Sequence, residues 1–411
     1  MATDSTYVIV GASLAGARAA QALRKEGFDG QVVLIGDEDE RPYERPPLSK
    51  EYLQGRAERE SIYVHPESWY ADNGVDLRLG TQVTAVDPGA HEVALGDGDR
   101  LGYSKLLLST GAAPRALPVP GADLDGVLYL RSVADSDRIK DAFASASRVA
   151  VVGGGWIGLE TAAAARVAGA EVTVLEMAEL PLLQVLGSEV ARLFARLHRD
   201  HGVDLRCGVQ VTEIIGTGGV AAGVQLADGT RVDADAIIVG AGISPNTRLA
   251  AEAGLDLDNG VQVDAQLRTS APDIHAAGDV ANAYHPLLGR HIRVEHWANA
   301  RHQPQAAAKG MLGQEVSYER LPYFFTDQYD LGMEYTGYVE PGGYDQVAFR
   351  GDVESGEYIA FWLAGGRVLA GMNVNVWDVT KPIQALVRSG KPVDVERLTD
   401  PQTPLEAVLG G

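Results

Sequence analysis

Short, fully apolar runs recur along the chain, and two of them are followed by the same sequence of features. Tyr7–Val10 and Val149–Val152 each lead directly into a glycine-rich loop and then into an alanine-rich stretch, 17–25 in the first copy and 159–168 in the second. An apolar run bounded by turn residues indicates a strand that is buried on both faces. Strand, glycine turn and helix form the start of a βαβ unit. The pattern therefore predicts an internal repeat of two parallel α/β modules.

Each predicted helix is followed by a second apolar strand that ends on an acid, Val32–Asp37 in the first copy and Val172–Glu176 in the second. Later exit strands are expected at 106–112 and 236–242. A further strand at 274–277 is assigned to the first module, so the second module lies inside the first. The predicted fold class is α/β, with two nested doubly wound dinucleotide-binding domains.

The last part of the chain has a different pattern. Apolar and polar residues alternate over 346–350, 358–363 and 367–374, and a helix is expected at 382–389. Alternation with period two indicates an antiparallel sheet with one face buried, so this part is predicted to be a C-terminal α+β domain. The expected domains are 1–112 with 242–320, then 113–241, and finally 321–411.

Composition narrows the possible partners and chemistry. The chain has 35 basic and 56 acidic residues and a net charge of −21, which argues against nucleic acid and anionic membranes as partners. No run of 18 apolar residues occurs, and the N-terminal apolar stretch lacks a preceding basic region, so a cytoplasmic location is expected. Cys207 is the single cysteine, which excludes an intrachain disulfide and a dithiol redox pair. It is expected to be packed rather than reactive.

The two glycine loops are candidate dinucleotide sites. A glycine turn between a strand and a helix lets backbone N–H groups approach a diphosphate at the positive end of the helix. An acid about twenty residues further on, Asp37 or Glu38 and then Glu176, is placed for ribose hydroxyls. The alternatives are a tight turn without a ligand and an acid at a solvated strand end. The expected loop contacts are Gly11, Ser13, Ala15 and Gly16 in the first loop, and Gly153, Gly155, Ile157 and Gly158 in the second loop; Gly242, at the end of the later exit strand, is a further expected cofactor contact.

The residues after each loop suggest which nucleotide goes where. Glu176 repels a 2′-phosphate, and Met177, Ala178 and Glu179 supply no cation to bind one, so NADH is expected over NADPH in the second module. Gly278 and Asp279 give the first module a second point of contact with its cofactor, which favours tightly held FAD there. The start of a following helix is expected to face the cofactor. The rival interpretation of Asp279 is a structural helix cap.

These motifs resemble the FAD-containing, NADH-dependent ferredoxin reductase family, which includes putidaredoxin reductase, rhodocoxin reductase and the reductase components of aromatic-ring dioxygenases. The resemblance covers nearly the whole chain. It implies a glutathione-reductase-like architecture, with 1–112 and 242–320 as the FAD-binding domain and 113–241 as the NADH-binding domain. The motifs that carry it are ERPYERPPLSK (40–50), STGAAPR (109–115), GAGISPN (240–246), HAAGD (275–279), VEHWANA (294–300) and PYFFTDQYD (322–330).

The resemblance also implies individual roles. Lys50 is expected near flavin N5 and paired with Glu160, which would orient the nicotinamide; no side chain need act as acid, base or nucleophile. The alternative interpretations are a solvated loop lysine for Lys50 and an ordinary acid near a helix N-terminus for Glu160. No metal site is expected. The FAD contacts that the resemblance implies are Ala15, Asp37, Lys50, Val83, Arg131, Asp279 and Trp297.

Two positions depart from the family pattern. Phe325 stands where putidaredoxin reductase has tryptophan, so the resemblance assigns no aromatic residue to an electron route, and Trp297 is equally a ring wall. Glu179 stands where relatives often carry arginine after the ribose-binding acid, which weakens NADH affinity but disfavours NADPH further.

The function implied by the resemblance is electron transfer from NADH through FAD to a small iron–sulfur ferredoxin that feeds a cytochrome P450 or a ring-hydroxylating dioxygenase. The alternatives are a quinone or monodehydroascorbate reductase and an apoptosis-inducing-factor-like NADH-binding flavoprotein. A monomer or weak homodimer is expected. Residues 280–320 carry five basic residues against three acids, a local charge of +2. With Lys381, Arg388 and Lys391 they form a candidate docking region for an acidic carrier, the alternative being scattered solvated side chains.

Overall fold

The computed structural model describes residues 5–409, which divide by their contacts into two compact units. The first unit contains 5–44, Arg59–Ala113 and Ser244–Pro322, and the second contains Arg45–Glu58, Pro114–Ile243 and 323–409. The sequence-derived assignment of 1–112 with 242–320 to FAD and of 113–241 to NADH stays a prediction. Within the described residues, no helix has the length and apolar character needed to cross a lipid bilayer.

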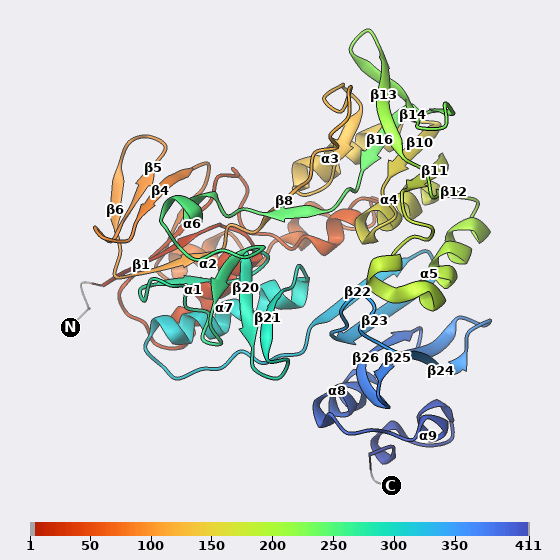
Figure 1. The fold of residues 1–411 in the computed structure, drawn as a ribbon. Helices are drawn as coiled ribbons and strands as arrows, with labels where there is room; N and C mark the ends of the chain where they lie inside the picture. Colours follow the sequence, from red (N-terminus) through yellow and green to blue (C-terminus); the bar gives the residue numbers. More distant parts are fainter. Residues whose placement is uncertain (1–4, 410–411) are drawn as a thin grey trace. The chain divides into compact units, whose positions relative to one another are not determined.

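The first unit is built on a parallel sheet of five strands in the order β19-β7-β1-β2-β3 (Figure 1). Val8 of β1 pairs with Val33 of β2 on one side and with Leu106 of β7 on the other, and all three side chains are fully buried. The apolar runs therefore form central strands with helices on the sheet, as their sequence predicts. The elements are β1 (Thr6–Val10), α1 (Leu14–Lys25), β2 (Gln31–Ile35), β3 (Val75–Arg78), β7 (Lys105–Leu108), β19 (Ile274–Ala276) and α7 (Trp297–Met311).

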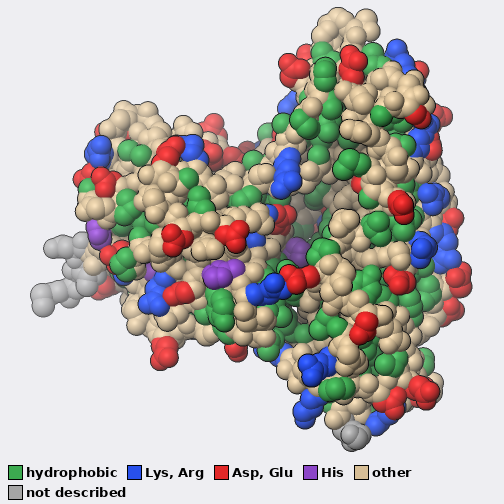
Figure 2. Space-filling model, viewed as in Figure 1, with side chains coloured by type: hydrophobic (Ala, Val, Ile, Leu, Met, Phe, Trp, Pro, Cys, Tyr) green, Lys and Arg blue, Asp and Glu red, His purple; other side chains and the backbone are tan. Residues whose placement is uncertain are grey.

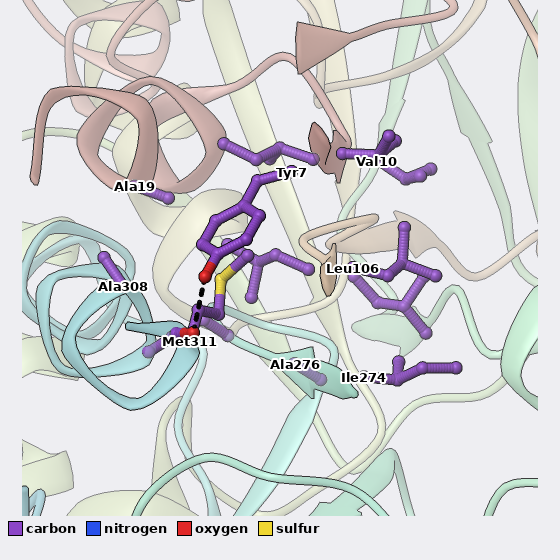
Figure 3. Close-up of a cluster of buried hydrophobic side chains, with 14 of the residues drawn as sticks. Tyr7, Val10, Ala19, Leu106, Ile274, Ala276, Ala308 and Met311 are labelled. Atoms are coloured by element: carbon purple, nitrogen blue, oxygen red, sulfur yellow. Dashed lines mark hydrogen bonds between the residues drawn. The ribbon is translucent and has the colours of Figure 1, made fainter. Parts of the chain in front are cut away.

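Helices α1 and α7 pack against this sheet through small and apolar side chains. Figure 3 shows Tyr7 of β1 reaching from the sheet toward α7, where its hydroxyl donates a hydrogen bond to the Met311 carbonyl at 2.9 Å. Ala19 of α1 and Ala308 of α7 are both fully buried beside it. The phenol thus supplies apolar area while its polar end is satisfied at the end of α7.

Smaller elements complete the first unit. The first unit also contains two three-stranded sheets: β4-β5-β6 is antiparallel, and β18-β20-β21 is mixed. The elements are η2 (Arg59–Ile62), α2 (Ser68–Asp72), β4 (Val83–Asp87), β5 (Glu92–Leu95), β6 (Arg100–Gly102), α6 (Arg248–Glu252), β18 (Val261–Val263), β20 (Ala281–His285) and β21 (Arg290–Arg293).

The second unit repeats the parallel arrangement, with strand order β12-β11-β10-β16-β9. Val151 of β10 pairs with Val174 of β11 and with Ile238 of β16, and these three residues are also fully buried. The elements are η1 (Pro46–Ser49), β9 (Val127–Tyr129), α3 (Val133–Phe143), β10 (Arg148–Val152), α4 (Trp156–Val167), β11 (Glu171–Glu176), α5 (Leu183–Asp200), β12 (Asp204–Cys207), β13 (Val211–Thr217), β14 (Val220–Leu226), β15 (Arg231–Asp233) and β16 (Ala236–Val239). Strands β8 (Ala112–Pro114) and β17 (Ile243–Pro245) contain two of the points where the chain passes between the units.

The C-terminal part of the second unit is an antiparallel sheet in the order β22-β23-β26-β25-β24. Its apolar face shares one hydrophobic core with α4 and α5, in which Trp362 and Phe194 are both buried. The elements are β22 (Tyr323–Gln328), β23 (Leu331–Gly337), β24 (Gln346–Asp352), β25 (Glu357–Ala364), β26 (Arg367–Val374), α8 (Thr380–Ser389), α9 (Val395–Thr399) and η3 (Leu405–Ala407).

The predicted fold class is confirmed, and one local prediction is wrong. No helix follows Asp279, because the chain turns directly into β20 at Ala281. The small residues after Gly278 pack as a strand beside β18, and the next helix, α7, begins only at Trp297. The absence of a helix there also removes the interpretation of Asp279 as a helix cap.

Candidate cofactor and redox site

The first glycine loop, between β1 and α1, is closed so tightly that side chains are excluded at two positions. Gly11 has φ +116°, and a Cβ there would fall on the carbonyl oxygen of Ser109. A Cβ at Gly16 would fall on the carbonyl oxygen of Gly11 and would lie 2.8 Å from Leu34 Cδ1. These glycines hold the start of α1 against the end of β1, as a dinucleotide-binding turn requires.

Ser13 and Ala15 occupy the remaining predicted positions of this loop. Ser13 is the N-cap of α1 with extended backbone (φ −117°), and its side chain makes no capping hydrogen bond. The first turn of α1 also contains no acid. The positive end of α1 is therefore left without a side-chain cap, which is the property of an anion-binding helix terminus.

The structure brings Gly278 to this same loop. A Cβ on Gly278, which has φ +81°, would lie 3.2 Å from the Cβ of Ala15, and the Gly278 N–H donates to Gln303 Oε1 at 2.9 Å. Asp279 follows directly and is half-buried. Ala15 and Gly278, 263 positions apart in the chain, thus meet at the start of α1, where the sequence predicts the second contact with the cofactor.

A cavity of about 580 Å³ opens beside Gly11 in the first unit. Asp37, predicted at the adenosine ribose, and Val83, predicted as an FAD contact, both line it. Glu38, the alternative acid, instead accepts a hydrogen bond from Tyr43 at 2.6 Å, so Asp37 is the acid that faces the cavity. The polar lining residues that sequence reasoning missed are Thr81, Gln82, Thr110, Asn246, Thr247 and Arg248.

Of these missed residues, Arg248 brings a cation to the cavity. Its guanidinium donates to the Thr84 carbonyl at 3.0 Å and to Glu252 at 2.8 Å. No motif contains it, whereas Asn246 closes the GAGISPN motif and was within reach of sequence reasoning.

Trp297, the first residue of α7, is held by polar contacts on two sides. Its indole Nε1–H donates to Glu44 at 2.7 Å, and the Arg301 guanidinium lies 4.8 Å from the ring centroid. His302 lies in the same cationic surroundings. Its burial, together with Arg320, Arg301 and Arg18, lowers its pKa to about 4.

The second glycine loop, between β10 and α4, has the same construction. A Cβ at Gly158 would fall on the carbonyl oxygen of Gly153, while a Cβ at Gly155 would meet nothing within 4 Å. Gly155 is the N-cap of α4 with extended backbone (φ −78°), like Ser13 in α1. This explains why serine is tolerated at the equivalent position of the first loop. Helix α4 also begins without a side-chain cap or an acid in its first turn.

Glu176 at the end of β11 is fixed beside this loop. Its carboxylate accepts hydrogen bonds from the backbone N–H groups of Gly154, at 2.5 Å, and Ala178, at 2.7 Å. Ile157, in the first turn of α4, is 41% exposed and offers an apolar surface at the same helix terminus. Gly242 follows β16, with φ +87° and its carbonyl accepting from the Arg115 N–H at 2.9 Å. The arrangement fits a ribose diol and a diphosphate better than a 2′-phosphate.

Lys50 and Glu160 form a buried ion pair within the second unit. Lys50 Nζ lies 2.8 Å from Glu160 Oε1, and the two residues are 6% and 3% exposed. Glu160 also accepts hydrogen bonds from Ser49 Oγ and, at 2.5 Å, from Thr326 Oγ1. The alternatives of a solvated loop lysine and a surface helix acid are therefore excluded, although the pair's role in catalysis stays a prediction.

The segment that carries Lys50 is anchored to the same unit. Ser136 of α3 donates to the Leu48 carbonyl at 2.8 Å, and Arg45 donates to the carbonyl of Arg131. The Phe325 ring centroid lies 5.5 Å from Lys50 Nζ. Burial raises the pKa of the neighbouring Asp327 carboxyl, against the opposing effect of Lys50. Ser49 and Thr326 were missed by sequence reasoning, although both stand inside quoted motifs.

Each unit contains the same set of features that a dinucleotide site requires. Two glycines exclude Cβ atoms, a helix of 12 residues begins without a side-chain cap, and a carboxylate stands at the end of the next strand. Backbone N–H groups and a carboxylate are the donor and acceptor set that diphosphate and ribose require. Fold and site together define the class of proteins with two dinucleotide-binding modules, one in each unit.

Comparison with known proteins places the chain within that class. Residues 5–304 match the pyridine nucleotide-disulphide oxidoreductase family and 323–409 match a reductase C-terminal domain. The chain is 40% identical to the anthranilate 1,2-dioxygenase system ferredoxin–NAD(+) reductase component of Burkholderia cepacia over 98% of this chain and 99% of the relative. It is 38% identical to rhodocoxin reductase of Rhodococcus erythropolis over 98% and 94%. Its structure is similar to putidaredoxin reductase in the covalent complex with putidaredoxin, with a TM-score of 0.94, 37% identity and coverage of 99% and 98%.

The chain therefore belongs to the pyridine nucleotide-disulphide oxidoreductase family and, within it, to the FAD-dependent NADH–ferredoxin reductases. Its cofactors are FAD and NADH. The disulphide chemistry in the broader family name does not extend to this chain, because Cys207 is its single cysteine. That thiol is half-buried, and burial raises its pKa, in keeping with a packing role.

Proposed function

We propose that this chain oxidises NADH and passes the electrons, through FAD, to a small iron–sulfur ferredoxin. The observation that carries the proposal is the pair of glycine loops, one in each unit, that each lead into a helix without a side-chain cap at its N-terminus. The chain is also related to ferredoxin reductases over nearly its full length. FAD, when bound, accepts two electrons as hydride and releases them singly.

The protein's own residues supply binding and orientation. The loop 11–16, Asp37, Val83, Arg131, Asp279 and Trp297 are proposed to hold FAD, and the loop 153–158, Glu176 and Gly242 to hold NADH. Lys50, whose ammonium is fixed by Glu160, is proposed to stabilise negative charge on the reduced cofactor, since a nearby cation favours the anionic form. No side chain is required to form a covalent bond with substrate.

NADH is proposed over NADPH on the basis of Glu176. Its carboxylate already accepts two backbone N–H groups, so it is fixed and charged at the position where a 2′-phosphate would lie. Residues 177–179 bring no cation to that position. The location is proposed to be cytoplasmic, where NADH is supplied and where a lone cysteine stays reduced.

The docking proposal concerns the basic window 280–320 of the first unit. Acidic and basic side chains are intermixed over the visible face of the molecule (Figure 2), so a local excess of +2 is a distinct feature in a chain of −21. Arg290 and Arg320 are exposed, whereas the Arg293 side chain is 7% exposed and pairs with Glu295. Arg290 and Arg320 are therefore the cations proposed to meet an acidic carrier, with exposed Lys381, Arg388 and Lys391 of the second unit as further candidates. A monomer or weak homodimer is proposed.

The function is tested by rapid mixing of the FAD-loaded protein with NADH, followed by mixing with a [2Fe–2S] ferredoxin, a quinone or oxygen. We expect fast bleaching of the flavin by NADH and preferential reoxidation by the ferredoxin. Reoxidation by quinone at an equal or higher rate would refute the ferredoxin assignment. Charge reversal of Arg290 and Arg320 should raise the KM for the carrier and leave ferricyanide reduction unchanged, since an unspecific small acceptor needs no docking surface.

A further inference from the structure

A chain of polar side chains leads away from Glu160 into the interior of the second unit. Thr326 Oγ1 lies 2.5 Å from Glu160 Oε1, and Gln328 Nε2 lies 3.2 Å from Thr326 Oγ1. His198 Nε2 lies 2.8 Å from Gln328 Oε1, and the Tyr329 hydroxyl lies 3.3 Å from His198 Nδ1. We call these four residues, Thr326, Gln328, His198 and Tyr329, the Glu160 relay.

Most of the relay is buried away from water. Thr326 and His198 are 0% exposed and Gln328 is 1% exposed. Its members come from β22, the turn after β22 and α5, so they connect the C-terminal sheet to α4, which carries Glu160. A buried polar group that lacks a partner costs about 1–3 kcal/mol, so three such groups in the core are tolerated only when all are bonded.

The hydrogens in the relay can run in only one direction. A carboxylate accepts and never donates, so the Thr326 hydroxyl donates to Glu160. Thr326 must then accept from the Gln328 amide N–H, which leaves the Gln328 carbonyl to accept from His198 Nε2–H. A neutral imidazole that donates from Nε2 accepts at Nδ1, and the Tyr329 hydroxyl is the donor placed there.

We propose that the Glu160 relay is a positioning device for the Lys50–Glu160 pair, with His198 locked as the neutral Nε2–H tautomer. This inference rests on the proposed function, in which that pair orients the reacting groups. The hydrogen bond from Thr326 to Glu160 Oε1 fixes the carboxylate, and the carboxylate in turn holds the Lys50 ammonium. The residues act through Glu160 and need not touch NADH or FAD.

The surroundings of His198 support a permanently neutral ring. Burial, against the opposing hydrogen bond to Gln328 and with a smaller contribution from His201, lowers the pKa of His198 to about 4. Burial also raises the pKa of Tyr329, against the effect of Arg166, so the phenol keeps its proton as a donor. The Tyr329 ring stacks on His201 with centroids 3.8 Å apart, which fixes the outer end of the relay.

The experiment compares two substitutions of one residue in the FAD-loaded protein. Thr326→Val removes the hydroxyl and keeps the shape, whereas Thr326→Ser keeps the hydroxyl. The tautomer of His198 is read by NMR with ¹⁵N-labelled histidine between pH 5 and 8, and flavin reduction by NADH is measured by rapid mixing.

In the wild-type chain and in Thr326→Ser, His198 should remain the Nε2–H tautomer across this pH range. In Thr326→Val the Gln328 amide is free to flip and present its NH₂ group to His198 Nε2. That nitrogen must then accept, so His198 should populate the Nδ1–H tautomer. The rate constant for flavin reduction should fall about tenfold, as expected when a reacting group is held less firmly. An unchanged tautomer in Thr326→Val, or equal losses in both variants, would overturn the relay.

A second variant covers the case in which Thr326→Val does not fold. Gln328→Glu is nearly isosteric and places a carboxylate against His198, so the pKa of His198 should rise from about 4 to above its ordinary value of 6.5. The new carboxylate also competes with Glu160 for the Thr326 hydroxyl. A His198 pKa that stays near 4 in Gln328→Glu would contradict the proposed contact. If NADH does not reduce the flavin of the wild-type protein, the proposed function is wrong. The His198 tautomer measured by NMR still tests the relay in that case.

Discussion

The Lys50 ammonium and the Glu160 carboxylate lie 2.8 Å apart in the interior of the second unit, although 110 positions separate them in the chain. Burying two charges costs several kcal/mol, and apolar residues of the same size often do as well or better for stability. Stability alone therefore gives no reason to keep this pair. The position of Glu160 in α4, directly after a glycine loop, gives a functional one.

Breaking the pair should be far more harmful to folding than removing it. Lys50→Met leaves the Glu160 charge buried with only neutral donors and should cost about 3–5 kcal/mol of unfolding free energy. The double variant Lys50→Met with Glu160→Gln removes the buried charge, keeps an acceptor for the Ser49 and Thr326 hydroxyls, and should recover most of that stability while still oxidising NADH poorly. Denaturant unfolding and steady-state kinetics measure the two effects separately. A double variant that is as unstable as the single one would show that the charges are not coupled.

The two parallel sheets were predictable because their signal is local. Val8 and Val151 lie in short apolar runs followed by glycines, and such runs have few alternatives to a central strand. The roles of Lys50 and Glu160 came from resemblance, and only the structure shows that both are buried. Thr326, Gln328 and His198 carry no local signal, because a buried polar residue is recognised only by partners that the fold brings from other elements. Arg248 reaches the cavity beside Asp37 for the same reason.

The preference for NADH should depend on one carboxylate. Glu176→Ser with Met177→Arg removes a repulsive charge and adds a cation at the ribose. We expect the ratio of kcat/KM for NADPH over NADH to rise on the order of 100-fold, the equivalent of about 3 kcal/mol. Glu171→Ser is the matched control, since Glu171 is exposed at the opposite end of the same strand. The assignment of Glu176 is wrong if both variants leave the ratio unchanged.

Arg248 should contribute to FAD retention. Arg248→Met removes a cation from the cavity that Asp37 and Val83 line, so the Kd of the apoprotein for FAD should rise about tenfold, as for one charged hydrogen bond. Quenching of FAD fluorescence on titration measures this. Glu252→Gln is the control, because Glu252 pairs with Arg248 at 2.8 Å without lining the cavity. Equal weakening by both substitutions would mean that the ion pair, and not contact with FAD, matters.

His275 should make the first unit sensitive to mild acid. Its side chain is 1% exposed, and burial, with Lys105 adding to it, lowers its pKa to about 4 from an ordinary 6.5. Between these values the unfolded chain binds a proton that the folded chain does not, so stability is complete above pH 6.5 and is lost as the pH falls toward 4. From pH 7 to 4.5 this one group should cost about 2–3 kcal/mol. In His275→Leu the free energy of unfolding, measured at several pH values, should fall less between pH 7 and 4.5 than in the wild-type chain. His291→Leu is the control, because His291 is exposed in β21, and it should show the full decrease. If His275→Leu retains the wild-type slope between pH 6.5 and 4.5, the buried imidazole is not the group that senses acid.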